Sequence, residues 1–195
     1  MGLDSIELVV EHERYFNISI PDKEAGQIFT VQNFVDCIAK HLHIVSNEKT
    51  LQTTVYIAFI NHLQALNKIN SYININDNIA LHINNPKDRF FLKLANNITI
   101  KTPKIATSNN TEAGVIYEFK KLINWTPTYI WEDLTVAEYI DATCAINYEQ
   151  LIKLENIKTK HEIYIVVMGI TAKFMGIDVF EIKPEKSFTN DLGID

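Results

Sequence analysis

Cysteine and glycine are scarce in this sequence, and each scarcity argues against a class of site. The only two cysteines, Cys37 and Cys144, lie in helical-looking segments without metal-ligand spacing. We therefore expect buried free thiols, and neither a disulfide framework nor a metal site. The six glycines form no GxGxxG or GxxxxGK pattern, so no backbone cradle for a nucleotide phosphate is predicted.

Long hydrophobic runs are absent as well. The longest apolar run, residues 163–171, is far shorter than the roughly 20 residues that a membrane-spanning helix needs. No leader-like stretch precedes Asp4, so we expect a cytoplasmic protein without a membrane span. With 47% hydrophobic and 22% charged residues, the composition is that of an ordinary globular protein.

The net charge of −6 is unevenly distributed along the chain. Residues 1–45 carry seven acidic and three basic side chains, and residues 160–195 carry six and four. The intervening residues 46–159 carry eleven of each sign. An acidic excess confined to two segments suits basic protein partners and argues against a nucleic-acid binder, although a simple effect on solubility is the alternative.

Helical spacing dominates the hydrophobic pattern. Thr30 is predicted to cap one helix, and a second helix is predicted to end at Gly176. Residues that could share one helix face recur in three segments: Ile6, Val9, His12 (or Glu13) and Phe16; Val31, Phe34, Val35, Ile38 and Leu42; Ile163, Val167, Ile170 and Phe174. Strand signals are weak throughout, so the sequence predicts an all-α fold.

Two segments resemble acyl carrier proteins, but in the reverse of the usual order. Residues 7–42, ELVVEHERYFNISIPDKEAGQIFTVQNFVDCIAKHL, resemble helices two to four of that family. Residues 161–195, ending in SFTNDLGID, resemble helix one and the following loop, where the family reads Asp-Leu-Gly-x-Asp-Ser-Leu. The resemblance implies a circularly permuted four-helix bundle built from residues 1–45 plus 160–195. Each piece is too short to fold alone, so the pieces meet within one chain or in a domain-swapped homo-oligomer.

The middle of the chain, residues 46–159, echoes both pieces and is predicted to be a second, diverged carrier-like helical domain. In the first echo, Val55-Tyr56-Ile57 followed by Tyr72 and Ile75 parallels Ile163-Tyr164-Ile165 followed by Phe180 and Ile182. In the second, Asn97-Ile98-Thr99-Ile100 parallels Asn17-Ile18-Ser19-Ile20. In the third, Leu134-Thr135-Val136 parallels Phe29-Thr30-Val31. An extra loop is expected over residues 102–110. The stretch 84–88 stands where this repeat would need Asp-Ser-Leu and contains no serine.

The resemblance implies a serine that carries 4'-phosphopantetheine at the start of the second family helix. Ser5, between Asp4 and Ile6, has the local look of that site. In the ungapped register, however, the serine position falls on Gly2, and Asp195 becomes the aspartate before it. Two functions stay open: a carrier of fatty-acid or polyketide-type acyl groups on Ser5, and an unmodified carrier-like docking or scaffold protein.

The same resemblance implies partners, namely acyl-chain enzymes with basic docking surfaces. The matching acidic positions are Glu7, Glu11 and Glu13, with Asp4 in the first turn. No enzymatic activity and no catalytic residue are predicted. The six histidines form no HExxH motif, and the bundle is expected to place none beside an acid or a nucleophile.

Overall fold

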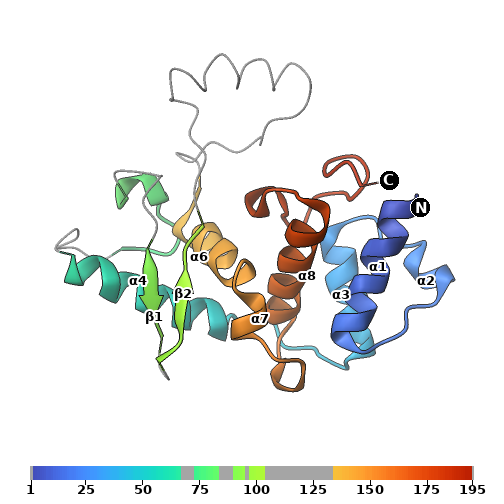
Figure 1. The fold of residues 1–195 in the computed structure, drawn as a ribbon, viewed down its shortest axis with the longest axis horizontal. Coiled ribbons are helices and arrows are strands. Elements are labelled where there is room, and N and C mark those ends of the chain that lie inside the picture. Colours follow the sequence, from blue (N-terminus) through green and yellow to red (C-terminus); the bar gives the residue numbers. More distant parts are fainter. Residues whose placement is uncertain (1, 67–72, 84–89, 95–96, 104–133, 195) are drawn as a thin grey trace, which may run out of the picture. The chain divides into compact units, whose positions relative to one another are not determined.

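The computed structural model describes residues 2–66, 73–83, 90–94, 97–103 and 134–194. The chain divides into two compact units: unit 1 comprises Met1–Thr53 and Cys144–Asp195, and unit 2 comprises Thr54–Thr143. The described elements are helices apart from one small two-stranded sheet (Figure 1). The predicted all-α fold is therefore confirmed, with a short hairpin added to it.

Unit 1 joins segments from opposite ends of the sequence. Its elements are α1 (Leu3–Phe16), α2 (Asp22–Ala25), α3 (Val31–His41), α7 (Tyr148–Leu151), η4 (Leu154–Asn156), α8 (Lys160–Met175) and η5 (Val179–Glu181). Helix α8 packs against both α1 and α3, and also against α7 and η5 (Figure 1). The first and last helices of the chain thus share one core. Residues 144–159, assigned to the middle domain from sequence, cluster with this unit.

Side-chain caps set the ends of the two central helices of unit 1. The Thr30 hydroxyl accepts from the backbone N–H of Asn33 at the start of α3, and Thr159 does the same for Glu162 at the start of α8. At the other end of α8, Gly176 adopts φ +68°, a left-handed conformation that glycine favours. The predicted Thr30 cap and the predicted end at Gly176 are both confirmed.

The core of unit 1 is apolar and closely packed around α8. Phe16, Phe34 and Ile38 are at most 1% exposed. On α8, four consecutive residues from Ile165 to Met168 are buried, because this helix is covered on several sides. Gly169 lets α7 approach α8 closely: a Cβ there would lie 2.6 Å from the carbonyl oxygen of Ala145 and would also meet the ring of Tyr148.

Unit 2 contains most of α4 (Thr50–Ala65), then η1 (Ile79–Leu81), the antiparallel strands β1 (Phe91–Lys93) and β2 (Thr99–Lys101), and most of α6 (Val136–Ala145). Leu92 pairs with Ile100, and both side chains are buried. The middle segment, expected from sequence to be helical, thus contains a short hairpin in addition to its helices. Each strand is three residues long with one buried side chain, which is too short to produce a recognisable alternating pattern.

In unit 1, the loop after α8 binds the N-terminus of α3. The N–H of Val31 donates to the carbonyl of Lys186 (3.0 Å), and the N–H of Phe188 donates to the carbonyl of Phe29 (3.0 Å). A third bond joins the Gln32 N–H to a loop carbonyl at 2.8 Å. Because the first N–H groups of a helix have no partner within it, this loop satisfies two of them.

Unit 2 repeats this arrangement with the loop before η1 and the N-terminus of α6. The N–H of Val136 donates to the carbonyl of Asp77, and the N–H of Ile79 donates to the carbonyl of Leu134, both at 2.8 Å. Ala137 bonds to a loop carbonyl at 2.8 Å, as Gln32 does in unit 1. We call this shared feature the loop-on-helix contact, formed by residues 184–188 on α3 and by residues 75–79 on α6.

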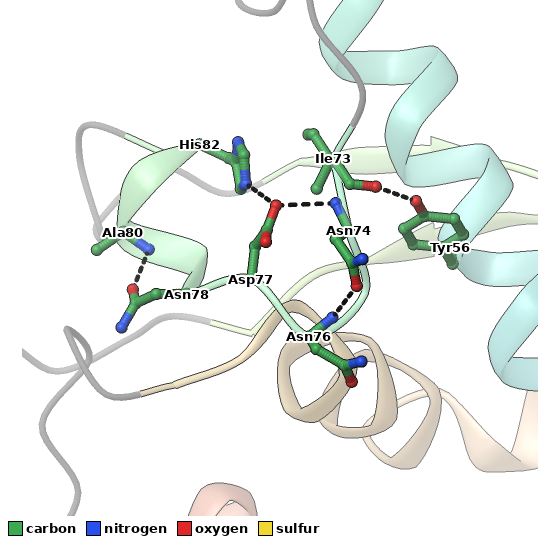
Figure 2. Close-up of polar contacts among 8 residues, drawn as sticks. All are labelled: Tyr56, Ile73, Asn74, Asn76, Asp77, Asn78, Ala80 and His82. Atoms are coloured by element: carbon green, nitrogen blue, oxygen red, sulfur yellow. Dashed lines mark hydrogen bonds and ion pairs between the residues drawn. The ribbon is translucent and has the colours of Figure 1, made fainter.

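A tyrosine hydroxyl supports the loop in each unit. In unit 1, Tyr164 donates to the carbonyl of Ile182 at 3.1 Å. In unit 2, Tyr56 donates to the carbonyl of Ile73 (Figure 2). By this bond, the residue of unit 2 that corresponds to Ile182 is Ile73. The sequence pattern had matched Ile75 to Ile182 and Tyr72 to Phe180, and Tyr72 lies outside the described residues.

Candidate functional site

Helix α1 begins and ends at well-defined residues. Gly2 is the N-cap, with an extended backbone (φ −76°, ψ −174°), and Asn17 closes the helix in the left-handed region. Asp4 lies in the first turn and Arg14 in the last, so each charge opposes the helix dipole at its end and stabilises the helix.

One face of α1 is buried and the opposite face carries exposed apolar residues. Leu8, His12 and Phe16, spaced four apart, face the core. On the outer side, Leu3 is 71%, Ile6 49% and Val10 44% exposed. Their spacing of three and four residues places these side chains in one row. We call the surface formed by Leu3, Asp4, Ile6, Glu7 and Val10 the α1 outer face.

The acids predicted to dock partners are in three different situations. Glu7 is exposed, with Asp4 exposed one turn before it. Glu11 forms an ion pair with Arg14 at 2.8 Å. The Glu13 carboxylate accepts from the backbone N–H of Ile20 at 2.5 Å, so it holds the loop after α1. Among these acids, Asp4 and Glu7 therefore contribute the free negative charge of the α1 outer face.

Ser5 does not occupy the helix cap. It is the third residue of α1, half-buried, and its hydroxyl donates to the carbonyl of Gly2 at 3.0 Å. Gly2, which occupies the cap, has no hydroxyl to esterify. A phosphopantetheine arm therefore cannot be attached at the cap residue of α1, and its attachment would require Ser5 inside the first turn. Asp195 lies outside the described residues.

His12 is a core residue, although it lies between the acids Glu11 and Glu13 in the sequence. The side chain is fully buried, its ring centroid lies 4.5 Å from that of Phe34, and its Nδ1 lies 2.7 Å from the carbonyl oxygen of Leu8. Burial lowers the pKa of His12 to about 4, so the ring is neutral at pH 7. It contributes no charge to partner binding.

Two other histidines contradict the expectation that none lies beside an acid. His41 Nε2 is 3.0 Å from the carboxylate of Glu24, in unit 1. His82 Nε2 is 3.1 Å from the carboxylate of Asp77, in unit 2 (Figure 2). The spacing in the sequence did not indicate the first pair, because its members lie on different helices, 17 residues apart.

A pocket of about 400 Å³ lies beside the C-terminal half of α1. It is lined by Glu11, Arg14, Tyr15, Tyr148, Glu149, Ile170, Lys173 and Phe174. The Tyr15 hydroxyl donates to the carbonyl of Ile152 at 3.0 Å, and burial raises the pKa of both Tyr15 and Tyr148. The phenols are therefore neutral. The pocket begins six residues beyond Ser5, about 9 Å along the helix, so it is separate from the helix start.

Among the residues that the structure describes, no helix combines the length and the apolar character that crossing a bilayer requires. The described cysteines, Cys37 and Cys144, are both buried thiols.

Part of the chain is similar to curated acyl carrier proteins. Over 39 residues it is 47% identical to an acyl carrier protein of Chlorobium phaeobacteroides, covering 20% of this chain and 50% of that protein. Over 41 residues it is 48% identical to one of Porphyromonas gingivalis (21% and 53%), and over 51 residues it is 42% identical to one of Cyanidioschyzon merolae (26% and 56%).

The chain thus spans about half the length of the curated relatives it matches, and it contains an acyl-carrier-protein-like region. No protein-family model matches the chain, and no solved structure matches it.

Proposed function

We propose that this protein is a carrier-like docking module of acyl-chain metabolism, which presents the α1 outer face to enzymes that recognise acyl carrier proteins. The observation that carries the proposal is the exposed row of Leu3, Ile6 and Val10 beside the free acids Asp4 and Glu7. A partner would need an apolar centre with a basic rim. The proposal includes the predicted cytoplasmic location and an absence of catalysis by the chain itself.

We further propose that unit 1 is a carrier-like domain with its segments in permuted order. Two contacts support this: α8 packs on α1 and α3, and residues 184–188 bind the start of α3. Unit 2 is proposed to be its diverged repeat. The loop-on-helix contact, the tyrosine under the loop, and the left-handed Asn17 and Asn97 occur in both units and support that relationship. Exchange of the two segments of unit 1 between copies of the chain, as a domain-swapped homo-oligomer, stays a prediction.

A second candidate function is that of a loaded carrier, with phosphopantetheine on Ser5. It is favoured by the position of Ser5 in the first turn of α1, where the helix dipole stabilises a phosphate. Against it stands the bond from the Ser5 hydroxyl to the carbonyl of Gly2. Attachment would have to release that hydroxyl from the helix.

Intact mass distinguishes the two functions. The full chain is incubated with coenzyme A and a broad-specificity phosphopantetheinyl transferase, with an ordinary acyl carrier protein as positive control. The docking function predicts an unchanged mass. A gain of one phosphopantetheine that disappears in Ser5→Ala would instead select the loaded carrier.

Association kinetics test the docking surface directly. Asp4→Lys combined with Glu7→Lys, at the two free acids of the α1 outer face, should slow association with the same transferase by about three- to tenfold at low salt, because charges at the rim of an interface mainly steer encounter. Glu48→Lys combined with Glu155→Lys is the matched control, since both residues are exposed acids of unit 1 and the change in net charge is identical.

The apolar row should act on dissociation. Ile6→Ser combined with Val10→Ser should speed dissociation, because it removes apolar surface at the centre of the contact. The native protein should also inhibit loading of the ordinary carrier. If the Asp4/Glu7 variant associates at the native rate, as the Glu48/Glu155 control should, or if the native protein does not compete, the proposed docking function is wrong.

A further inference from the structure

Three side chains with metal-binding atoms converge in unit 1, on the helices α2 and α3. Cys37 and His41 are four residues apart on α3, so their side chains lie on one face of that helix. Glu24, on α2, reaches the same place. The Cys37 sulfur, a His41 ring nitrogen and a Glu24 carboxylate oxygen all lie within 4.8 Å of one another.

We propose that Glu24, Cys37 and His41 form a binding site for a divalent transition-metal ion, with zinc as the best match. Thiolate, imidazole and carboxylate are the three ligand types that zinc takes in proteins. At normal zinc–ligand distances, two tetrahedral ligands lie about 3.6 Å apart. This value lies between the 3.0 Å that separates the Glu24 carboxylate from His41 Nε2 and the 4.8 Å limit of the cluster, so small side-chain movements would close the three ligands around an ion.

The carboxylate is oriented for this role. One oxygen of Glu24 lies 3.0 Å from His41 Nε2, and the other lies 2.7 Å from the ammonium of Lys40. An ion would take the first oxygen and displace the contact to His41, while Lys40 keeps the second. Lys40 would then act as an outer-shell partner that fixes the carboxylate, as such partners commonly do around metal sites.

Accessibility and charge also fit an ion. The side chains of His41 and Glu24 are 24% and 23% exposed, so an ion can enter from solvent, whereas Cys37 is buried at 8%. A thiolate and a carboxylate together neutralise a divalent cation. Burial, followed by the neighbouring Glu24, raises the pKa of Cys37 to about 11, so binding must displace the thiol proton. Three protein ligands leave one tetrahedral position for water.

Cobalt is the spectroscopic probe for the test. Co²⁺ is titrated into the tag-free, fully reduced full-length protein. We expect one ion per chain, visible d–d bands of tetrahedral intensity, a near-ultraviolet sulfur-to-cobalt charge-transfer band, and loss of all these bands when one equivalent of Zn²⁺ is added. Absence of binding, or binding without the charge-transfer band, would overturn the proposal and leave the cluster as a plain ion pair.

Variants assign the ligands. Cys37→Ser should abolish the charge-transfer band, whereas Cys144→Ser, at the other buried cysteine, should keep it. Glu24→Gln and His41→Asn should each weaken binding at least tenfold, and the matched controls Glu48→Gln and His43→Asn should leave it unchanged. Persistence of the band in Cys37→Ser would exclude the site.

A second measurement covers the case in which Cys37→Ser does not fold. In the native protein, bound Zn²⁺ should slow alkylation of Cys37 by iodoacetamide at least tenfold, as read by peptide mass. Alkylation of Cys144 should keep its rate. If zinc changes neither rate, or changes both equally, the proposed site does not exist.

Discussion

In both units a loop binds the N-terminus of a helix in the same way. The units differ in the segment that precedes an asparagine with a left-handed backbone conformation. In unit 1, Asn17 (φ +50°) closes α1, a helix of fourteen residues with an exposed apolar and acidic face. In unit 2, Asn97 (φ +59°) lies between the three-residue strands β1 and β2. The loop-on-helix contact therefore does not depend on the helix that would bind partners. Among the described residues, the α1 outer face that we propose for docking lies in unit 1.

The tightest packing in unit 1 should give the largest effect. Gly169→Ala places a Cβ 2.6 Å from the carbonyl oxygen of Ala145, which is backbone and cannot move freely. We expect the free energy of unfolding to fall by about 3 kcal/mol, the upper end of typical overpacking costs. Chemical denaturation measures the change.

Gly26→Ala is the control for that variant. A Cβ at Gly26 meets its nearest atom, the Asp22 carbonyl oxygen, at 3.4 Å, so the effect should stay within about 0.5 kcal/mol. Equal effects from the two substitutions would show that the approach of α7 to α8 is looser than described.

Acid should destabilise unit 1 through His12. Because the folded-state pKa is lowered to about 4 from 6.5, the unfolded chain binds a proton first as the pH falls. The contribution of neutral His12 is complete above pH 6.5, is lost between pH 6.5 and 4, and amounts to about 3 kcal/mol. Denaturation of the native protein and His12→Leu across this range measures it.

The difference between those two proteins isolates His12 from the carboxylates, which also titrate in acid. His12→Leu should be the less acid-sensitive of the two, and its advantage should grow as the pH falls. Parallel pH profiles would mean that His12 is not buried in the folded protein. Among the described residues of unit 2, no histidine is buried, so hydrogen exchange in that unit should not depend on this substitution.

The tyrosines under the two loops test the shared contact. Tyr164→Phe and Tyr56→Phe each remove one hydroxyl bond to a loop carbonyl, and each should cost about 1 kcal/mol. Hydrogen exchange resolves the location: Tyr164→Phe should speed exchange in residues 182–188, and Tyr56→Phe in residues 73–79. Faster exchange in both loops from either substitution would contradict separate contacts in the two units.

The smallest effect on stability is expected at the exposed apolar side chains. Leu3→Ser in unit 1 and Phe91→Ser in unit 2 should each change the free energy of unfolding by no more than about 0.5 kcal/mol, since these residues are 71% and 59% exposed. Only Leu3→Ser should weaken binding to the phosphopantetheinyl transferase. Equal loss of binding in both variants would place the docking surface elsewhere.

Local rules predicted the helices of unit 1 well because their signals lie within a few residues of each other. The Thr30 cap acts on Asn33, three residues away, and Gly176 ends α8 by its own conformation. The hairpin was missed because each strand buries one residue. The cluster of Glu24, Cys37 and His41 was not predicted, because Glu24 lies on a different helix from the other two. The spacing of Cys37 and His41 by itself did not indicate a metal site.

The sequence alone determined the all-α class, the start of α3 at Thr30, the end of α8 at Gly176 and the resemblance to acyl carrier proteins, because these follow from spacing and capping along the chain. Only the tertiary structure decided which side chains of α1 are free to meet a partner. Glu13 is held by the backbone of Ile20, His12 is buried against Phe34, and Ile6 is exposed. Burial depends on what packs against a helix, and α8, which packs against α1, lies almost 150 residues further along the chain.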